Sequence, residues 1–430
     1  MTKKKFWVAS GKVVAVATAI VVVSLMSVPR AGAATQFKTL HRFTGGADGG
    51  NPHAGLIVDQ AGNLYGTTWA GGNLSFCGGS GCGVVFELTP TRHGGWKETV
   101  LHRFKGGDTD GANPPEGRLV LDAAGNLYGV THNGGRYGYG VIFKLKPSTE
   151  GSWTERVLHN FSGGSDGAYP YGSLILDTDG NLYGTTTFGS NKYCGMGCGV
   201  VFELTRNPEG RWKEKVLHAF AWSDGAYPVT PLVFDPQGNL YGTAWMGGSS
   251  GQYGLIFRLA PNPDGSWTET VLHNFTGGDD GGNSRGGLLL DGGGNLYGTT
   301  ADWGASCCGV AFELTPSGGS WTEQVVHHFQ GGEGGDNPWA ALVFDQAGNL
   351  YGTTRSGGNL SGCGGQGCGV VFKLTPDGNG GWKKSSLHTF ADDPGASPWT
   401  GLIIDGLGNL YGTTYGDGST TFGTVYEITP

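Results

Sequence analysis

The segment DQAGNLYGTT, residues 59–68, is the first of seven closely related copies along the chain. The other six are DAAGNLYGVT, DTDGNLYGTT, DPQGNLYGTA, DGGGNLYGTT, DQAGNLYGTT and DGLGNLYGTT. The first glycine of GNLYG falls at residues 62, 125, 180, 238, 294, 348 and 408, a mean interval of about 58 residues, which indicates a propeller, a solenoid or another repeat array. The usual estimate of the number of domains from chain length assumes no internal repetition, so it does not apply to this chain.

Each repeat predicts a four-stranded antiparallel meander. The apolar run GLIVD, residues 55–59, predicts an innermost strand buried on both faces. DQAG then supplies the aspartate and glycine of a hairpin turn. NLYGTT predicts the second strand, and its central Gly66 suggests that another backbone approaches closely there. GVVFELTP, residues 83–90, and WKETVLHRF, residues 96–104, predict the third and fourth strands.

The order of these segments distinguishes a ring from an open array. The first LHxF copy, residues 40–43, precedes every other strand, and the last third-strand copy, GTVYEITP, ends the sequence at residues 423–430. A solenoid would leave both ends open, whereas this permuted order lets an N-terminal strand complete the last blade. We therefore predict an all-β fold over residues 34–430, a seven-bladed β-propeller of four-stranded antiparallel blades closed by the N-terminal strand.

The recurring pattern GLxxDxxGNLYGTTxxGG…GxVFxLTP resembles the GloVer tandem repeat of bacterial exported proteins described as having a choice of anchor. The resemblance covers residues 37–430, with small departures such as Val130 and Ala244 in place of threonine. It implies a surface or extracellular propeller and brings no established biochemical activity with it.

Residues 1–33 differ in kind from the repeats and predict a secretory signal peptide. Three lysines at residues 3–5 precede an apolar run over residues 13–28, and Ala-Gly-Ala at residues 31–33 offers a cleavage site. The alternative is an uncleaved membrane anchor, because the run is only slightly shorter than a membrane span. We expect a secreted protein, extracellular or periplasmic, with no stable membrane insertion after cleavage.

The charge of the chain argues against nucleic acid as a partner. The full sequence has 27 basic and 35 acidic residues, a formal charge of −8. Cleavage after Ala33 would remove five basic residues and no acidic one, which leaves a formal charge of −13. Such a surface repels phosphate backbones, so we do not expect a nucleic-acid partner.

We expect the protein to be a monomer.

The eight cysteines form four close pairs: Cys77 with Cys82, Cys194 with Cys198, Cys307 with Cys308, and Cys363 with Cys368. In an exported chain, such pairs predict local disulfides. Zinc is the alternative, but each pair lies in a different repeat and so far from the others in space. The adjacent pair could form a bond only with an unusual, strained geometry.

Most chemically capable residues recur with the repeat and are explained by the blade. This holds for the histidines of LHxF, the aspartates of DxxG, which form turns, and the tryptophans that begin the fourth strands, which we expect to cover blade edges. The two DTDG segments suggest calcium but lack the further oxygen ligands of a calcium loop. No HExxH or phosphate-binding loop is present. GxSxG occurs at residues 163–167, 247–251 and 282–286, but all these copies lie in glycine-rich loop segments that no helical pattern follows. We predict no catalytic residue, no metal and no cofactor.

Positions that differ in every repeat indicate where a ligand would bind. In an antiparallel meander the cysteine loops and the Asp-Gly loops share one face of the disc, and this face carries the longer, more variable loops. Side chains at the strand ends that lead to this face are heavily aromatic, as expected of a recognition site at the channel mouth. The candidate ligand-binding residues are Trp69, His132, Trp245, Trp303, Trp339, Arg355, Trp399 and Tyr415. The alternative is that these rings only plug the channel or pack under the loops.

Two functions remain open from the sequence. The first is an exported, non-catalytic binding propeller that recognises a glycan or another cell-surface polymer. The second is a propeller enzyme, a hydrolase or lyase, for which the non-repeated polar residues of the loop face are His53, Glu116, His132, Asp302 and Arg355. An enzyme would need a convergent acid-base pair, and a pocket shared by His132 and Glu116 would favour it.

Overall fold

The computed structural model describes residues 35–190, 194–305, 307–392, 395–416 and 421–430. The predicted signal peptide, residues 1–33, lies outside the described residues. In the described part of the chain, no helix has the length and apolar character needed to cross a membrane.

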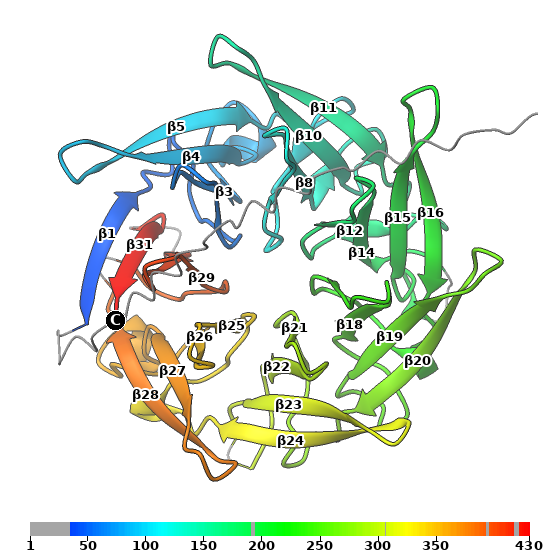
Figure 1. The fold of residues 1–430 in the computed structure, drawn as a ribbon. Coiled ribbons are helices and arrows are strands. Elements are labelled where there is room, and N and C mark those ends of the chain that lie inside the picture. Colours follow the sequence, from blue (N-terminus) through cyan, green and yellow to red (C-terminus); the bar gives the residue numbers. More distant parts are fainter. Residues whose placement is uncertain (1–34, 191–193, 306, 393–394, 417–420) are drawn as a thin grey trace, which may run out of the picture. The chain divides into compact units, whose positions relative to one another are not determined.

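Seven antiparallel sheets stand around a common axis, and the prediction of a seven-bladed propeller is confirmed (Figure 1). The innermost strands of blades 1 to 7 are β2 (Ile57–Val58), β7 (Val120–Leu121), β13 (Ile175–Leu176), β17 (Val233–Phe234), β21 (Leu289–Leu290), β25 (Val343–Phe344) and β29 (Ile403–Ile404). The second strands are β3 (Leu64–Thr68), β8 (Leu127–Thr131), β14 (Leu182–Phe188), β18 (Leu240–Ala244), β22 (Leu296–Thr300), β26 (Leu350–Thr354) and β30 (Leu410–Thr414).

The outer two strands of each blade form long hairpins. The third strands are β4 (Val84–Pro90), β10 (Val141–Pro147), β15 (Val200–Arg206), β19 (Leu255–Pro261), β23 (Val310–Ser317), β27 (Val370–Pro376) and β31 (Thr424–Thr429). The outermost strands are β5 (Trp96–Arg103), β11 (Trp153–Asn160), β16 (Trp212–Ala219), β20 (Trp267–Asn274), β24 (Ser320–His328), β28 (Trp382–Thr389) and, in blade 7, β1 (Gln36–Arg42). Two short strands, β6 (Gly111–Ala112) and β9 (Asn133–Gly134), pair beside blade 2, and β12 (Ala168–Pro170) pairs with β14 in blade 3.

The N-terminal strand closes the ring as the segment order predicted. β1 pairs antiparallel with β31, from Gln36 opposite Thr429 to Arg42 opposite Thr424. Figure 1 shows these two strands, blue and red, side by side in blade 7. Phe37 of β1 also stacks on His388 of blade 6, with ring centroids 3.9 Å apart. The N-terminal and C-terminal strands are therefore joined by backbone hydrogen bonds within blade 7, and the N-terminal strand is packed against blade 6 as well.

The innermost strand differs from its prediction in length and burial. GLIVD predicted a five-residue strand buried on both faces, but β2 has two residues, and Val58 is 39% exposed. All five residues of the second strand β3 are buried instead. The reason is position: β3 has a strand on each side and a neighbouring blade against each face, whereas the inner strand faces the axis.

The glycine of GNLYG has a different role from the one predicted. A Cβ on Gly66 would lie 2.6 Å from Cζ of Phe86 and 3.0 Å from Cδ2 of Leu56. Both residues belong to the same blade, so the expected approach of another blade's backbone is wrong. The glycine makes room for the phenylalanine ring of the neighbouring strand, which is fully buried in the core.

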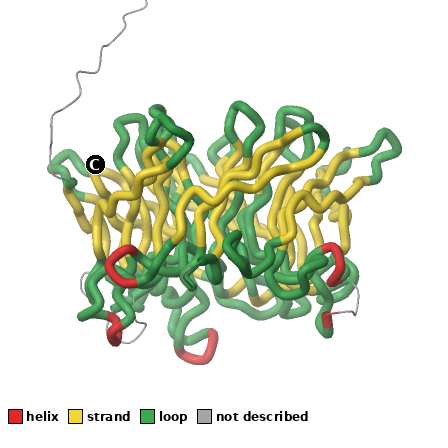
Figure 2. Tube along the Cα trace, turned by 90° about the horizontal axis from the view of Figure 1, so that it is seen from below, coloured by secondary structure: helices red, strands yellow, loops and turns green. Residues whose placement is uncertain are grey.

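The two faces of the disc carry different loops. The DxxG turns and the hairpins between third and fourth strands lie on one face. The other, which we call the loop face, carries the cysteine loops and the Asp-Gly loops with the short 3-10 turns η1 (Cys77–Gly79), η3 (Trp222–Asp224), η4 (Gly332–Gly334) and η5 (Cys363–Gly365). Figure 2 shows these turns on one side of the disc only.

Candidate functional site

At the axis, non-repeated side chains from all seven blades meet. The chain reaches the loop face twice in each blade, once just before the innermost strand and once just after the second strand. Most of the residues at these positions join a continuous series of side-chain contacts around the axis. We call the twelve residues of this series the inner ring: His53, Trp69, His132, Tyr169, Phe188, Tyr227, Trp245, Arg285, Trp339, Arg355, Trp399 and Tyr415.

One part of the inner ring, in blades 4 to 7, alternates tryptophan and arginine. The Arg285 guanidinium carbon lies 4.2 Å from the ring centroid of Trp245 and 4.5 Å from that of Trp339. The Arg355 guanidinium carbon lies 4.4 Å from Trp339 and 4.5 Å from Trp399. Each guanidinium is thus held between two indoles, an arrangement that favours the cation electrostatically.

The other part, from blade 7 through blade 4, consists of aromatic and histidine rings. Tyr415 stacks on Trp399, with centroids 5.0 Å apart, and His53 meets Tyr415 edge to face at 4.7 Å. His53 stacks on Trp69 at 5.1 Å, and Trp69 in turn contacts His132 at 5.8 Å. The series then continues through Tyr169, Phe188 and Tyr227 back to Trp245.

The structure brings together seven of the eight predicted site residues. Trp303 is the exception, because it is 46% exposed and contacts Tyr253 rather than the inner ring. Its indole Nε1 donates a hydrogen bond to Asn283 Oδ1 at 3.1 Å. In blade 5 the member of the series is instead Arg285, which lies in the loop before the innermost strand β21 and contacts Trp245 and Trp339.

Five ring members are not among the eight candidate ligand-binding residues: His53, which the sequence offered only for the enzyme hypothesis, Arg285, Tyr169, Phe188 and Tyr227. Tyr169 and Tyr227 have φ angles of 54° and 58°, in the left-handed region. The corresponding residues of the other blades have the same conformation but are asparagine or serine: Asn51, Asn113, Asn283, Asn337 and Ser397. Asparagine tolerates this region far better than tyrosine. A bulky residue at a strained position suggests a role for its ring, and a blade-by-blade comparison of the sequence contains this signal.

Arg118 also distinguishes one blade from the others. It stands where the other blades have glycine, serine, proline or alanine, and its Nη2 donates to the Leu402 carbonyl of blade 7 at 3.0 Å. The side chain passes Gly55 of blade 1, where a Cβ would lie 2.6 Å from its Nε. Burial lowers the pKa of Arg118 to about 10, so it remains charged at neutral pH. Arg118 therefore places a cation at the axis.

A small cavity of about 50 Å³ lies at the axis. Its lining includes Glu116, Arg118, Arg285, Trp339 and Trp399. Since one water needs about 10–15 Å³ by this measure, the cavity has room for only a few waters or one small polyatomic group.

The acid-base residues of the enzyme hypothesis do not form a direct pair. The Tyr171 hydroxyl donates to Glu116 Oε1 at 2.8 Å, and the ring centroids of Tyr171 and His132 are 6.1 Å apart. Within the described residues, no hydrogen bond joins Glu116 and His132 directly. Burial raises the pKa of Glu116 to about 7, against the opposing effects of the Tyr171 hydrogen bond, Arg285 and Arg355. Glu116 lines the axial cavity, whereas His132 is not part of its lining.

The two histidines of the inner ring are poor proton carriers near neutral pH. Burial lowers the pKa of His53 to about 4, and the charges of Arg355 and His132 act in the same direction. Burial also lowers the pKa of His132, although a hydrogen bond with Asn133 opposes the shift. Burial raises the pKa of Asp302, while Arg285 and Arg355 lower it. No arrangement of catalytic acid and base follows from these groups.

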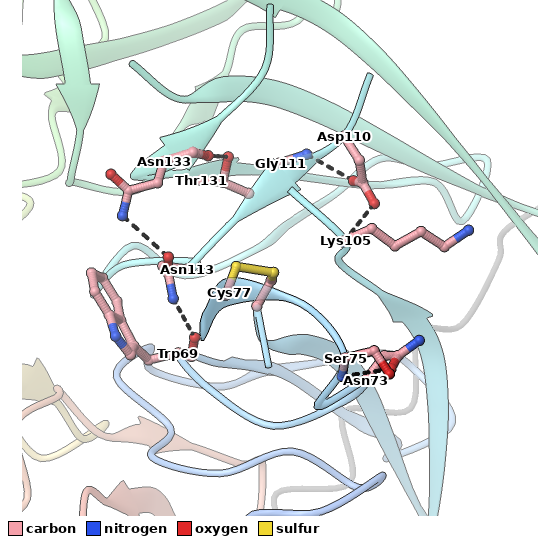
Figure 3. Close-up of a disulfide and its surroundings, with 11 residues drawn as sticks. Trp69, Asn73, Ser75, Cys77, Lys105, Asp110, Gly111, Asn113, Thr131 and Asn133 are labelled. Carbon is pink, nitrogen blue, oxygen red and sulfur yellow. Dashed lines mark hydrogen bonds between the residues drawn. A yellow bond between two sulfur atoms is a disulfide. The ribbon is translucent and has the colours of Figure 1, made fainter. Parts of the chain in front are cut away.

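A larger cavity, of about 630 Å³, opens on the loop face beside the inner ring. Trp69 and Tyr415 of the inner ring contribute to its lining, with Asn51, Asn113 and the cysteine loop of blade 1. Figure 3 shows Asn113 between Trp69 and Asn133; its Nδ2 donates to the Trp69 carbonyl at 3.0 Å. A cavity of this volume is within the range of sites for small molecules or short oligomers.

All four predicted cysteine pairs are disulfide-bonded, including the adjacent pair Cys307 and Cys308. Each bond lies within one loop of the loop face. Among the described residues, one group of three potential metal ligands comes together, Cys363, Cys368 and Asp392, and two of them are consumed by the disulfide.

The chain matches the Gloeobacter/Verrucomicrobia repeat family over residues 25–196, 75–277, 192–365 and 246–430, and it belongs to this family. No curated protein matches the sequence. Among solved structures, a fungal alcohol oxidase in complex with copper is similar at 15% identity, with a TM-score of 0.57 over 93% of this chain and 77% of that one. A putative 6-phosphogluconolactonase from Bacteroides uniformis is similar at 14% identity, with a TM-score of 0.50 over 79% of this chain and 86% of that one. At these identities the likeness concerns the fold alone, because propellers host unrelated functions.

Proposed function

We propose that this protein is an exported, non-catalytic binding propeller whose ligand, a saccharide or another surface polymer, docks on the loop face at the channel mouth. The observation that carries the proposal is the inner ring. It joins aromatic and charged side chains from all seven blades, and its members change from blade to blade where the repeat is otherwise nearly constant.

The neighbouring cavity supplies a place for the body of the ligand. It lies beside Trp69 and Tyr415 and is bounded by asparagines and by the disulfide-bonded loop of Cys77 and Cys82. Amphipathic aromatic rings and amide groups together suit a ligand with both apolar ring faces and hydroxyl groups. The loop disulfides support export, since such bonds persist in oxidising compartments.

A second candidate function, a propeller enzyme, rests on Glu116, whose raised pKa of about 7 suits proton transfer. The binding function is preferred because Glu116 has no suitable acid or base as a partner. Within the described residues, its carboxyl group has one hydrogen-bond partner, the Tyr171 hydroxyl, and burial and Glu116 raise the pKa of that hydroxyl. The enzyme hypothesis is tested by a screen for hydrolysis or elimination of polysaccharides, with the Glu116→Gln variant as the control. Turnover by the unmodified protein that is lost in the variant would establish the enzyme function.

The proposed binding is tested by a glycan array probed with the mature protein and with Trp69→Ala. Loss of one aromatic contact should weaken binding about 2- to 12-fold, corresponding to about 0.5–1.5 kcal/mol. Leu407→Ala is the matched control, because Leu407 is 89% exposed in a turn on the opposite face. Absence of binding to every saccharide, or equal losses in the two variants, would contradict the proposal.

A further inference from the structure

The arginine-containing part of the inner ring is rich in hydrogen-bond donors that have no acceptor. The indole Nε1 atoms of Trp245, Trp339 and Trp399 are buried and make no hydrogen bond within the described residues. In the same part of the chain, the structure gives no hydrogen bond or ion pair for the guanidinium groups of Arg285 and Arg355. Indole and guanidinium groups donate and cannot accept. Buried polar groups are normally paired, so three unpaired buried indole donors beside two half-buried guanidinium groups require an explanation.

The faces of these indoles are already occupied. Both faces of Trp339 are covered, one by Arg285 and one by Arg355. Trp399 has Arg355 against it at 4.5 Å and Tyr415 stacked on it at 5.0 Å. These two tryptophans are therefore not open platforms on which a sugar ring could stack, as their aromatic character suggested. What they can offer to a ligand is the N–H edge.

The charge around these donors is positive in an otherwise acidic protein. Arg118, Arg285 and Arg355 contribute three cations at the axis, whereas the nearby acids are Asp302 and Glu116. Glu116 is largely neutral below pH 7, because burial raises its pKa to about 7. The full chain has a formal charge of −8. A local excess of donors and positive charge attracts an acceptor with negative charge.

We propose that the centre of the inner ring is an anion site, in which Arg285 and Arg355 bind the carboxylate or sulfate group of an acidic saccharide. The axial cavity of about 50 Å³ has room for a group of that size and not for a sugar ring. Arg285 lines this cavity directly, together with Arg118 and Glu116, whereas Arg355 lies beside it against the lining residues Trp339 and Trp399. The remainder of the saccharide lies above it, toward Trp69 and Tyr415 and the larger cavity. The saccharide part of this inference rests on the proposed function, whereas the anion site does not depend on it.

Titration calorimetry of the full mature protein with three probes tests the site. The probes are an oligogalacturonate, a sulfated oligosaccharide and a neutral oligosaccharide of the same length. We expect the acidic probes to bind and the neutral probe to bind at least about tenfold more weakly, since a hydrogen bond to a charged group contributes about 1.5–3 kcal/mol. The stronger of the two acidic probes identifies carboxylate or sulfate as the preferred group.

Two variants separate the guanidinium groups from the general positive charge. The Arg285→Gln, Arg355→Gln double variant should lose at least about tenfold in affinity for the acidic probe. Arg206→Gln is the matched control. The Arg206 guanidinium carbon lies 5.4 Å from the ring centroid of Trp212 on the outer edge of blade 3, so this substitution removes the same kind of contact away from the axis. Equal affinity of the double variant and the control would overturn the anion site.

A third variant gives a readout that does not depend on removing a cation. Ionised Glu116 repels an anion, and its neighbours are Tyr171, Arg285 and Arg355. Affinity for the acidic probe should therefore fall as the pH rises from 6 to 8, and Glu116→Gln should remove this fall. A pH profile identical in Glu116→Gln and in the unmodified protein would contradict the placement of the anion.

The results distinguish this inference from the proposed function. Equal binding of neutral and acidic saccharides, unchanged in the arginine variant, overturns the anion site and leaves the saccharide function standing. Binding of inorganic sulfate and of glucuronate without any saccharide polymer supports the anion site and removes the polymer as ligand. Failure of every anionic probe to bind overturns the anion site.

Discussion

The DxxG turn of each blade and the inner ring differ in how they use polar side chains. At the DxxG turn, which joins the innermost and second strands, the same network recurs: Asp59 Oδ1 accepts hydrogen bonds from the backbone N–H groups of Ala61 and Asn63, and the Tyr65 hydroxyl lies 3.1 Å from Asp59 Oδ2 and 3.0 Å from Glu87 Oε1. In the inner ring, residues change from blade to blade, and several donors have no acceptor within the described residues.

Polar residues that are paired in the same way in every blade stabilise the fold, whereas unpaired residues that change from blade to blade are available to a ligand. Burial raises the pKa of Asp59, but its hydrogen bonds from Asn63, Tyr65 and Ala61 outweigh burial and hold the pKa below its usual value. The hydrogen bonds of the DxxG turn therefore stabilise the charged form of its aspartate. The histidines of LHxF also serve the fold, since five of them contact an aspartate of the following loop at 3.2–3.5 Å.

The largest expected effect comes from opening the ring. Deletion of residues 35–44 removes β1 and exposes the edge of β31, which invites association with other chains. We expect loss of the cooperative unfolding transition and concentration-dependent aggregation, measured by calorimetry and light scattering. A truncated protein that melts like the intact one would show that the N-terminal strand does not close the propeller.

A smaller effect is expected where the repeat requires glycine. Gly66→Ala places a methyl group 2.6 Å from the Phe86 ring in the core of blade 1, and overpacking of this kind costs about 1–3 kcal/mol in the free energy of unfolding. The control is Gly406→Ala, because a Cβ there meets nothing within 4 Å. Denaturant unfolding of both variants checks the prediction, and equal stability of the two would refute it.

The smallest effect is a pH-dependent one at an outer strand. Burial raises the pKa of Glu98 to about 7, with Asp48 adding to the shift and Arg103 opposing it. The folded protein therefore holds a proton that the unfolded chain loses between about pH 4.5 and 7, so this group makes the protein less stable as pH rises through that range. Glu98→Gln should be more stable than the unmodified protein at pH 8 and equal to it at pH 4.

Thermal unfolding of Glu98→Gln at both pH values tests the sign. Glu333→Gln, an exposed glutamate on the loop face, is the control. A stability difference of the same size at pH 4 and pH 8 would show that packing, and not ionisation, distinguishes glutamine from glutamate at this position.

The sequence predicted the fold well because each strand is present seven times. A single copy of GLIVD was insufficient to show that the innermost strand is short and that the second strand is the buried one, since both segments are apolar. The glycine of GNLYG was interpreted wrongly for a related reason: sequence separation does not show that Phe86 lies directly opposite Gly66 across the hairpin.

The site was predicted in its location and only partly in its chemistry. Subtraction of the repeat identified the axial positions, but it grouped Trp303 with them although its side chain faces solvent. The pairing of Arg285 and Arg355 with three indoles depends on rotamers and on contacts between blades, which no local pattern encodes. For the same reason, the sequence suggested stacking platforms where the structure has covered faces and free N–H edges.

The outer tryptophans hold blades together, whereas we propose that the inner tryptophans serve a ligand. Trp96 and Trp153 are partly buried and pack against Tyr411 and Tyr65 of the preceding blades and against the hydrophobic core clusters there. Among the described residues, the core clusters do not include Trp339 or Trp399.

The most direct measurement is the free energy of unfolding, by denaturant titration without ligand, of two double variants. Trp96→Ala with Trp153→Ala should lose several kcal/mol, because removal of a packed tryptophan costs about 3–5 kcal/mol. Trp339→Ala with Trp399→Ala should lose less than half as much. A loss in the inner pair equal to or greater than that in the outer pair would make the inner ring part of the fold and contradict the account.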